Sequence, residues 1–252
     1  MMQSKKRVKG RRGEESVKKK PNTKIVAILL VIFILAMSLI IVYKPPQKSE
    51  WSVSRSGLLS YPSDRGAVAY TVKEFENNTS YTLEKIEYES KDANITAILR
   101  IPKSDKKVPA VIIIPGAGVS AEGVQGVAKM LSSMGYASLA IDKRVSGIVL
   151  RDYLYFKEGG EPTQSHHAKM AWDVLRAYDL LRSRKEIDGI AVLGESEGGR
   201  IAIISAAMEP GIKGMIGISA FGDDFVNNSR NYSDATQLRF FKSIDPDEYI
   251  GL

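Results

Sequence analysis

The stretch Ile190-Ala191-Val192-Leu193-Gly194-Glu195-Ser196-Glu197-Gly198-Gly199 decides the fold of this 252-residue chain. Its first four residues form an apolar run, which is typical of a short buried strand. A Gly-x-Ser-x-Gly turn follows directly, and the next residues, Arg200–Met208, have the composition of a helix. Strand, sharp turn, serine and helix in this order predict a nucleophile elbow, in which the serine stands at the carboxyl edge of a sheet.

The residues around Ser196 suit a nucleophile. Such a turn strains the backbone at the serine, and Gly194 and Gly198 have no Cβ that could collide across it. The helix N-terminus behind the serine favours developing negative charge. We therefore predict Ser196 as the catalytic nucleophile, and the backbone N–H of Glu197 as one donor of an oxyanion hole. The side chains of Glu195 and Glu197 receive no acid-base role.

A second glycine loop, Pro115-Gly116-Ala117-Gly118, follows the apolar run Val108–Ile114. In folds that carry a serine elbow, a loop at this place supplies the other oxyanion-hole donor. We predict the N–H of Ala117 as that donor, with Gly118 as the alternative. Taken alone, the loop is also compatible with a plain strand-to-helix turn that needs small residues.

Apolar patterning elsewhere predicts an α/β fold. Alternation over Tyr81–Tyr88 and Ile95–Ile101, around a turn at Lys91-Asp92-Ala93, predicts a β-hairpin. Buried strands and amphipathic helices then alternate. The strands are expected at Val108–Ile114, Tyr136–Ile141, Ile190–Leu193 and Gly214–Ser219, and the helices at Glu122–Met134, Ser165–Arg182 and Arg200–Met208. We expect a doubly wound, mostly parallel sheet that begins with an antiparallel hairpin.

The N-terminal region predicts a membrane anchor. Residues 1–24 carry +8 of a total net charge of +7, so the remainder carries −1 and gives no basis for a nucleic-acid partner. Residues 25–43 are apolar except for Ser38, and about 19 such residues can cross a bilayer as a helix. The positive flank predicts a cytoplasmic N-terminus and an extracytoplasmic remainder, in a single-pass protein of the cell membrane. A cleaved signal peptide is the alternative.

The motifs resemble those of the α/β-hydrolase superfamily, particularly its dienelactone-hydrolase-like and prolyl-oligopeptidase-like branches. The similarity covers residues 81–252. It rests on the hairpin, Val111–Gly118, Met134–Asp142, the helix end Leu180–Arg184 before Ile187-Asp188, and Gly194–Gly199. The expected domains are a basic tail (1–24), a transmembrane helix (25–43), a linker (44–69) and the hydrolase domain (70–252). The linker is polar, and its Trp51 and Leu58-Leu59 can dock on a neighbouring surface.

The resemblance also implies a catalytic acid and base that the motifs do not supply. In the family, the triad aspartate and histidine follow the seventh and eighth strands, and both would lie beyond Leu252, so we expect an incomplete domain that lacks its C-terminal strands. Asp223 or Asp224 is an alternative acid, with an ordinary acidic loop as the competing interpretation. His166 or His167, the only histidines, is an alternative base, with exposed residues of a helix N-terminus as the competing interpretation.

These residues predict an extracytoplasmic serine hydrolase that acts on a carboxylic ester, thioester or amide. The competing hypothesis is a non-catalytic binding or surface protein, or an inactive fragment, that keeps the elbow as scaffold. The chain has no cysteine and no His/Asp/Glu cluster with the spacing of metal ligands, so we expect neither a metal nor a cofactor. The expected partners are an acyl substrate and the lipid bilayer at residues 25–43.

Overall fold

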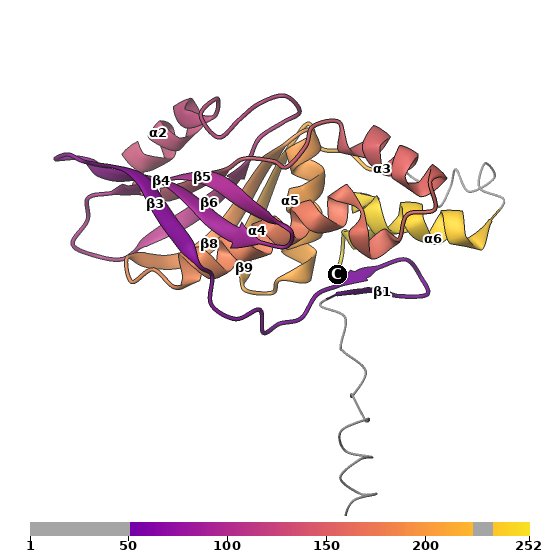
Figure 1. Ribbon diagram of the computed structural model, residues 1–252. Helices are drawn as coiled ribbons and strands as arrows, with labels where there is room; N and C mark the ends of the chain where they lie inside the picture. The colour runs from indigo at the N-terminus through magenta and orange to yellow at the C-terminus, as the bar shows by residue number, and fades with distance from the viewer. Residues whose placement is uncertain (1–50, 224–233) are drawn as a thin grey trace, which may run out of the picture. The chain divides into compact units, whose positions relative to one another are not determined.

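One sheet of seven strands organises the protein, in the order β3-β4-β5-β7-β6-β8-β9 (Figure 1). The computed structural model describes residues 51–223 and 234–252, all of which belong to the unit Ser49–Leu252. The strands are β3 (Tyr70–Asn77), β4 (Tyr81–Ser90), β5 (Ala93–Pro102), β6 (Val108–Ile114), β7 (Ala137–Ile141), β8 (Ile187–Glu195) and β9 (Ile212–Ile218).

The sheet is mixed rather than mostly parallel. Strands β3, β4, β5 and β7 pair antiparallel in succession. Strand β6 then pairs in parallel with both β7 and β8, and β8 pairs in parallel with β9. The predicted hairpin is present as β4–β5, but β3 adds a further antiparallel strand, so three of the six pairings in this sheet are antiparallel. The expected fold class is corrected accordingly.

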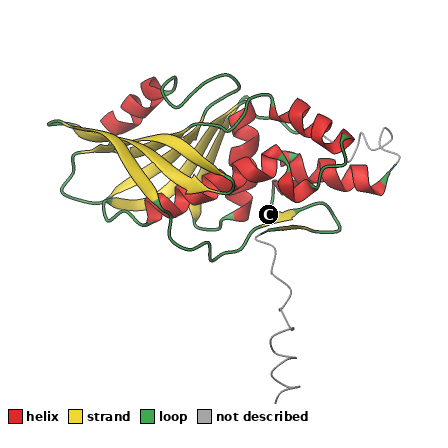
Figure 2. Ribbon diagram, in the orientation of Figure 1, coloured by secondary structure: helices red, strands yellow, loops and turns green. Residues whose placement is uncertain are grey.

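Helices cover both faces of the sheet (Figure 2). Because side chains alternate along a strand, Ile112 and Ile114 pack on one face while Val111 and Ile113 pack on the other. The first face receives α4 and α5, and the second receives α2. The three helices are α2 (Gln125–Ser133), α4 (His166–Arg182) and α5 (Glu197–Met208).

Two more helices lie near the carboxyl end of the parallel strands. The polar stretch expected after β7 contains α3 (Ile148–Lys157) and a 3-10 turn η1 (Pro162–Gln164). Helix α6 (Ala235–Ile244) and a 3-10 turn η3 (Pro246–Tyr249) close the chain. Phe240 and Phe241 of α6 pack with Phe156 of α3, so these two helices share a small apolar cluster.

The residues before β3 are docked rather than extended. Two short strands, β1 (Ser52–Val53) and β2 (Leu59–Ser60), pair with each other. Trp51 is only 3% exposed, and its ring lies 5.1 Å from that of Trp172 on α4 and 5.4 Å from that of Tyr61. Residues 51–61 are therefore part of the packed structure, through aromatic contacts with α4.

The expected single-pass membrane architecture is contradicted. Across residues 51–223 and 234–252, no helix combines the length and the apolar character that crossing a bilayer requires. The longest described helix, α4, has 17 residues, or about 26 Å at 1.5 Å per residue, and carries Lys169 and Asp173. Residues 25–43, to which the anchor was assigned, and the basic tail 1–24 lie outside the described residues. The transmembrane part of the fold class and the membrane localisation are corrected on this finding.

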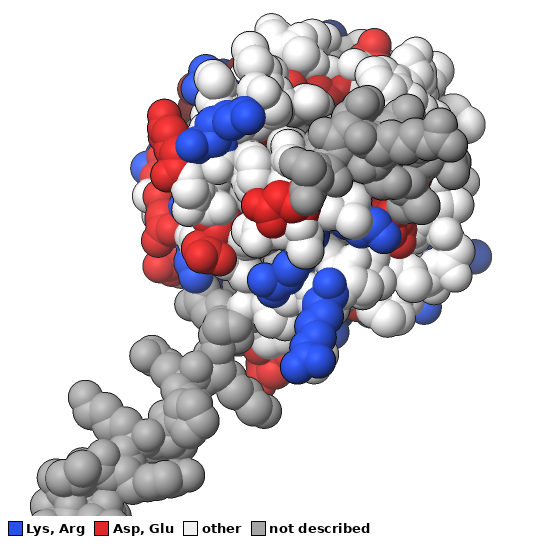
Figure 3. All heavy atoms as spheres, turned by 90° about the vertical axis from the view of Figure 1, so that its right-hand side faces the viewer, with Lys and Arg blue, Asp and Glu red and all other residues white. Residues whose placement is uncertain are grey.

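Charged side chains of both signs are interspersed with uncharged ones on the face shown in Figure 3. Several cations lie beside carboxylates of other elements. Arg184 donates two hydrogen bonds to Glu84, at 2.8 and 2.9 Å, and Arg65 lies 2.8 Å from Asp179. The first pair holds β4 against the turn after α4, and the second holds the segment before β3 against α4 itself.

Candidate active site

Ser196 stands in a strained backbone conformation at the junction of β8 and α5. Its φ of 50° and ψ of −114° lie outside the regions that side-chain-bearing residues ordinarily occupy. Three backbone hydrogen bonds hold it there. The Ser196 N–H donates to Ile218 of β9 at 2.8 Å, and its carbonyl accepts from Gly199 and Arg200 at 3.0 and 3.2 Å. The hydroxyl makes no capping bond to α5.

The turn is so tight that glycine is required on both sides of Ser196. A Cβ at Gly194 would lie 2.7 Å from the backbone N of Gly199, and a Cβ at Gly198 would lie 2.6 Å from the carbonyl oxygen of Pro115. Both distances are shorter than any normal contact and involve backbone atoms. The second one also shows that the elbow packs directly against the loop after β6.

That loop and the elbow share one pocket. Ala117, Ser196 and Glu197 all line a cavity of about 610 Å³. Glu197 is the first residue of α5, so its N–H has no partner within the helix. The N–H of Gly118, the alternative donor, is already engaged, because it donates to Ser146 Oγ at 3.1 Å. The geometry therefore favours Ala117 over Gly118 as the second donor.

The rest of the pocket is mainly apolar. Its walls come from α3, α6 and the segment after β9, and the bulky residues among them are Val149, Leu150, Tyr153, Phe221 and Phe241. Tyr153 stacks on Phe241, with ring centroids 6.2 Å apart. The charged side chains of the lining are Glu197, Arg200 and Asp223, and apolar side chains make up most of the remainder.

The side chain of Glu197 fixes α3 over the elbow. Its Oε2 accepts hydrogen bonds from the backbone N–H groups of Gly147 and Ile148, at 2.6 and 3.0 Å. These groups lie at the N-terminus of α3, where a carboxylate is favoured by the helix dipole. Gly147 has a φ of 71°, which glycine adopts without strain. Because Glu197 directly follows Ser196, its side chain ties α3, which forms part of the pocket wall, to the serine elbow.

Lys143 is a buried cation that contacts both the loop after β6 and Glu197 of α5. Its side chain is 3% exposed, and Nζ donates to the carbonyl oxygens of Pro115, at 2.9 Å, and Gly116. The same Nζ lies 3.4 Å from Glu197 Oε1, which accepts no hydrogen bond. Burial lowers the pKa of Lys143, and the charge of Glu197 opposes that shift. The ammonium thus bridges the loop after β6 and the start of α5.

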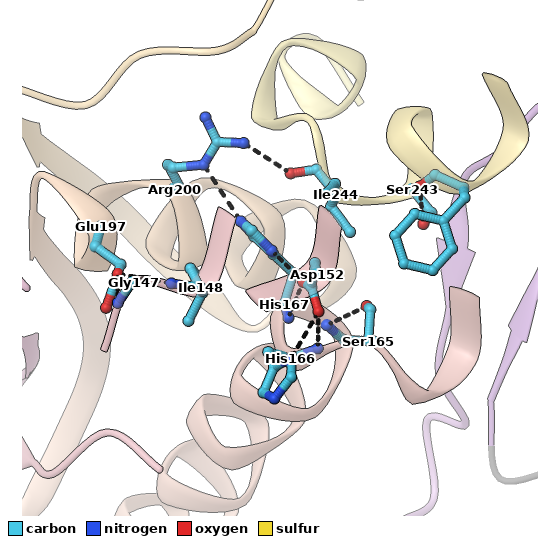
Figure 4. Close-up of polar contacts among 12 residues, drawn as sticks. Gly147, Ile148, Asp152, Ser165, His166, His167, Glu197, Arg200, Ser243 and Ile244 are labelled. Atoms are coloured by element: carbon cyan, nitrogen blue, oxygen red, sulfur yellow. Dashed lines mark hydrogen bonds and ion pairs between the residues drawn. The ribbon is translucent and has the colours of Figure 1, made fainter. Parts of the chain in front are cut away.

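A series of polar side chains connects α3, α4 and α5, as Figure 4 shows. Asp152 of α3 is fully buried and accepts four hydrogen bonds from the start of α4. Its Oδ1 binds the backbone N and Nδ1 of His166, at 2.6 and 2.8 Å, and its Oδ2 binds the same atoms of His167, at 3.0 and 2.6 Å. His167 Nε2 then accepts from Arg200 Nε at 3.3 Å.

These contacts determine the protonation states of Asp152 and His167. Arginine can only donate, so His167 Nε2 is unprotonated and Nδ1 carries the proton that binds Asp152. Burial lowers the pKa of His167, and the nearby Asp152 does not offset this. For Asp152, burial alone would raise the pKa, but the hydrogen bonds from His166 and His167 outweigh it and lower the pKa. His167 is therefore neutral and Asp152 is ionised.

The alternative base assigned to His166 or His167 is not favoured by this arrangement. Both ring nitrogens of His167 are engaged, so neither is free for Ser196. His166 is held by Asp152 through Nδ1, and neither histidine lines the pocket. The expectation that these residues are simply exposed is also wrong for His167, whose side chain is fully buried.

The alternative acid, Asp223, does line the pocket, but its visible partners are structural. Its Oδ2 accepts from Arg200 Nη2 at 2.5 Å, and its backbone N–H donates to Asp245 Oδ1 at 3.0 Å. Asp224 lies outside the described residues. No group of three potential metal ligands occurs within residues 51–223 and 234–252.

An α/β sheet with a strained serine elbow and an adjoining glycine loop defines an α/β hydrolase. The family model of the serine aminopeptidases, S33, matches residues 105–238, and the chain belongs to this family. A search of curated proteins found no match.

Solved structures share the fold. An acetyl xylan esterase from Paenibacillus sp. R4 has a TM-score of 0.53 at 20% identity, over 69% of this chain and 61% of that one. Acetyl xylan esterase 1 from Thermoanaerobacterium sp. JW/SL YS485 has a TM-score of 0.51 at 16% identity, over 70% and 67%. A glucuronoyl esterase from Solibacter usitatus has a TM-score of 0.51 at 18% identity, over 77% and 64%. The chain thus spans less than two thirds of the Paenibacillus and Solibacter proteins.

The sequence predicted that the elbow and the glycine loop form one site, but it gave no role to Lys143 or Asp152, which support them. Lys143 and Asp152 fall in the stretch that reads as a polar loop. Their only sequence signal is position, since Lys143 follows a buried strand by two residues and therefore lies at the carboxyl edge of the sheet, beside the elbow.

Proposed function

We propose that this chain is a serine hydrolase of carboxylic esters, with Ser196 as the nucleophile and the N–H groups of Ala117 and Glu197 as the oxyanion hole. The observation that carries the proposal is that these three residues line one pocket, while three backbone hydrogen bonds hold Ser196 in a strained conformation. Assignment to the dienelactone-hydrolase-like or prolyl-oligopeptidase-like branch stays a prediction.

In the proposed reaction, Ser196 Oγ bonds to the carbonyl carbon, and the electrons of the C=O bond move to its oxygen. The two N–H groups stabilise this oxyanion, and each such donor contributes about a hundredfold or more in rate. Collapse expels the alcohol, which takes up the proton lost by Ser196, and water then releases the acid by the same steps. A base has to carry the proton from Ser196 to the alcohol. No histidine of residues 51–223 and 234–252 lines the pocket, so an imidazole there does not supply this base.

The charges of the pocket support an ester rather than a peptide with a free amino terminus. An aminopeptidase has to hold the ammonium group of its substrate, which requires an uncompensated acceptor or carboxylate. The two carboxylates that line this pocket already have cationic partners, because Glu197 lies beside Lys143 and Asp223 binds Arg200. The solved structures named above are esterases, and the apolar walls suit an ester with an apolar acyl group.

Covalent labelling of the whole chain with a fluorophosphonate tests the proposal. We expect a phosphonylated peptide that contains Ser196, and no labelling of Ser196→Ala. A folded wild-type chain that stays unlabelled at Ser196 would refute the nucleophile.

A second candidate is a non-catalytic binding protein on the hydrolase scaffold. The observation that favours it is that both histidines are held by Asp152, away from the pocket. In that case the chain would bind an apolar ester reversibly, with a measurable Kd, and would leave both the ester and the fluorophosphonate unreacted.

A further inference from the structure

The contacts of Lys143 converge on the two segments that carry the proposed oxyanion donors. Its Nζ donates to the carbonyl oxygens of Pro115 and Gly116 and pairs with the carboxylate of Glu197. No part of the proposed bond-making steps uses this buried cation. Its position therefore needs a separate explanation.

The geometry of the peptide bond supplies one. In a trans peptide unit, the C=O group and the N–H group point in opposite directions. The carbonyl of Gly116 and the N–H of Ala117 belong to the same unit, and the described residues contain no cis bond. The Gly116 oxygen accepts hydrogen bonds from Lys143 Nζ and, at 3.2 Å, from the Val119 N–H. The Ala117 N–H is therefore directed to the other side of the peptide unit, where Ala117 lines the pocket with Ser196.

The second donor depends on the same cation. Glu197 presents its own N–H beside Ser196, and its side chain is 8% exposed. One carboxylate oxygen accepts two hydrogen bonds from the start of α3. The other, Oε1, accepts no hydrogen bond from the described residues and lies 3.4 Å from the Lys143 ammonium. A buried carboxylate without a counter-charge is unstable, so loss of Lys143 would displace the Glu197 side chain and the start of α5 with it.

We propose that Lys143 is a positioning residue, which orients the oxyanion hole by holding the Gly116–Ala117 peptide and the Glu197 side chain at once. This inference rests on the proposed esterase function. Lys143 does not line the pocket, so it acts through the residues that do. Its effect is to direct two N–H groups at the point where the carbonyl oxygen becomes negative.

The decisive variant is Lys143→Met, which keeps the length of the side chain but removes its donors and charge. We expect kcat for p-nitrophenyl butyrate to fall by about a hundredfold, the usual effect of losing one oxyanion donor, with KM changed by less than about threefold. Lys143→Arg should recover part of the loss. The matched control is Lys185→Met, since Lys185 is exposed, and it should match the wild type.

A sulfur-substituted substrate separates positioning from a general loss of structure. Sulfur is a weak hydrogen-bond acceptor, so a thionoester draws little benefit from an oxyanion hole. The ratio of kcat/KM for the ester to that for its thiono analogue should collapse in Lys143→Met, because only the ester reaction slows. Equal losses on both substrates, or full activity of Lys143→Met, would overturn the proposal.

Two further measurements cover folding and inactivity. The double variant Lys143→Met/Glu197→Gln leaves no unpaired charge, so it should fold and keep the collapsed ratio; a restored ratio would contradict the proposal. If the wild type hydrolyses neither substrate, the proposed function fails, but the amide ¹⁵N shift of Ala117 still reports on the Gly116 carbonyl. That shift should change in Lys143→Met and not in Lys185→Met, and an unchanged shift would overturn the positioning role.

Discussion

Replacing Asp152 by asparagine tests how α3 is joined to α4. The carboxylate accepts four hydrogen bonds, two at each oxygen, from the backbone N and Nδ1 of His166 and of His167. An amide keeps one oxygen but presents an NH₂ group to the other two donors. Hydrogen bonds to a charged group contribute about 1.5–3 kcal/mol each, so the loss of two predicts a destabilisation of about 3–6 kcal/mol. This is a large share of the total stability of an ordinary domain.

Denaturant unfolding followed by far-ultraviolet circular dichroism measures this difference. The control is Asp188→Asn, an exposed position that we expect to change stability by no more than about 0.5 kcal/mol. The pKa of Asp152 is lowered in the folded state. Its carboxylate therefore contributes fully to the free energy of unfolding above the pKa of the unfolded aspartate, and the contribution is lost as pH falls below that pKa. The gap between Asp152→Asn and wild type should therefore narrow below about pH 4. A deficit under 1 kcal/mol at pH 7, or one that does not depend on pH, would refute the reasoning.

Three other changes are predicted by the same contacts. Gly198→Ala should abolish fluorophosphonate labelling, because the new Cβ would collide with the Pro115 carbonyl; retained labelling would show that the elbow tolerates a side chain. His167→Gln should flatten the pH dependence of stability below about pH 6.5. The pKa of His167 is lowered in the folded state, so the wild type loses stability as pH falls below the pKa of the unfolded chain. Urea midpoints of both proteins at pH 7 and pH 5 measure the difference. Phe241→Ala should lower the free energy of unfolding in urea by about 3 kcal/mol, because Phe241 is buried. The larger pocket should also favour bulkier acyl groups over acetyl. An unchanged ratio of kcat/KM for p-nitrophenyl octanoate to that for p-nitrophenyl acetate would exclude Phe241 from the substrate site.

Local pattern was enough to predict the elbow and the parallel strands. A serine between two glycines, after an apolar run, constrains its own backbone, and the constraint involves residues within a few positions of each other. Helix α4 was predicted over Ser165–Arg182 from its amphipathic pattern, which is also local. In the structure Ser165 is its N-cap and accepts from the N–H of Ala168 at 3.1 Å. These features depend on short-range contacts that the sequence displays directly.

Helix α3 and the buried histidine could not be predicted in this way. The N-terminus of α3 is stabilised by Glu197, a side chain about 50 positions further along the chain. His167 stands at the start of a helix, where a polar residue is usually exposed, and is buried because Asp152 and Arg200 approach it from other elements. Each partner is ordinary in its own segment, and only the folded arrangement reveals the pair.

The aromatic contact between Trp51 and Trp172 has a consequence for spectroscopy. These are the only tryptophans of the sequence, and their rings lie 5.1 Å apart. Intrinsic tryptophan emission therefore comes from one spot, where the segment 51–61 meets α4. It will report the detachment of that segment, whereas rearrangements around Ser196 call for an added fluorophore or a spectroscopic method that does not depend on tryptophan.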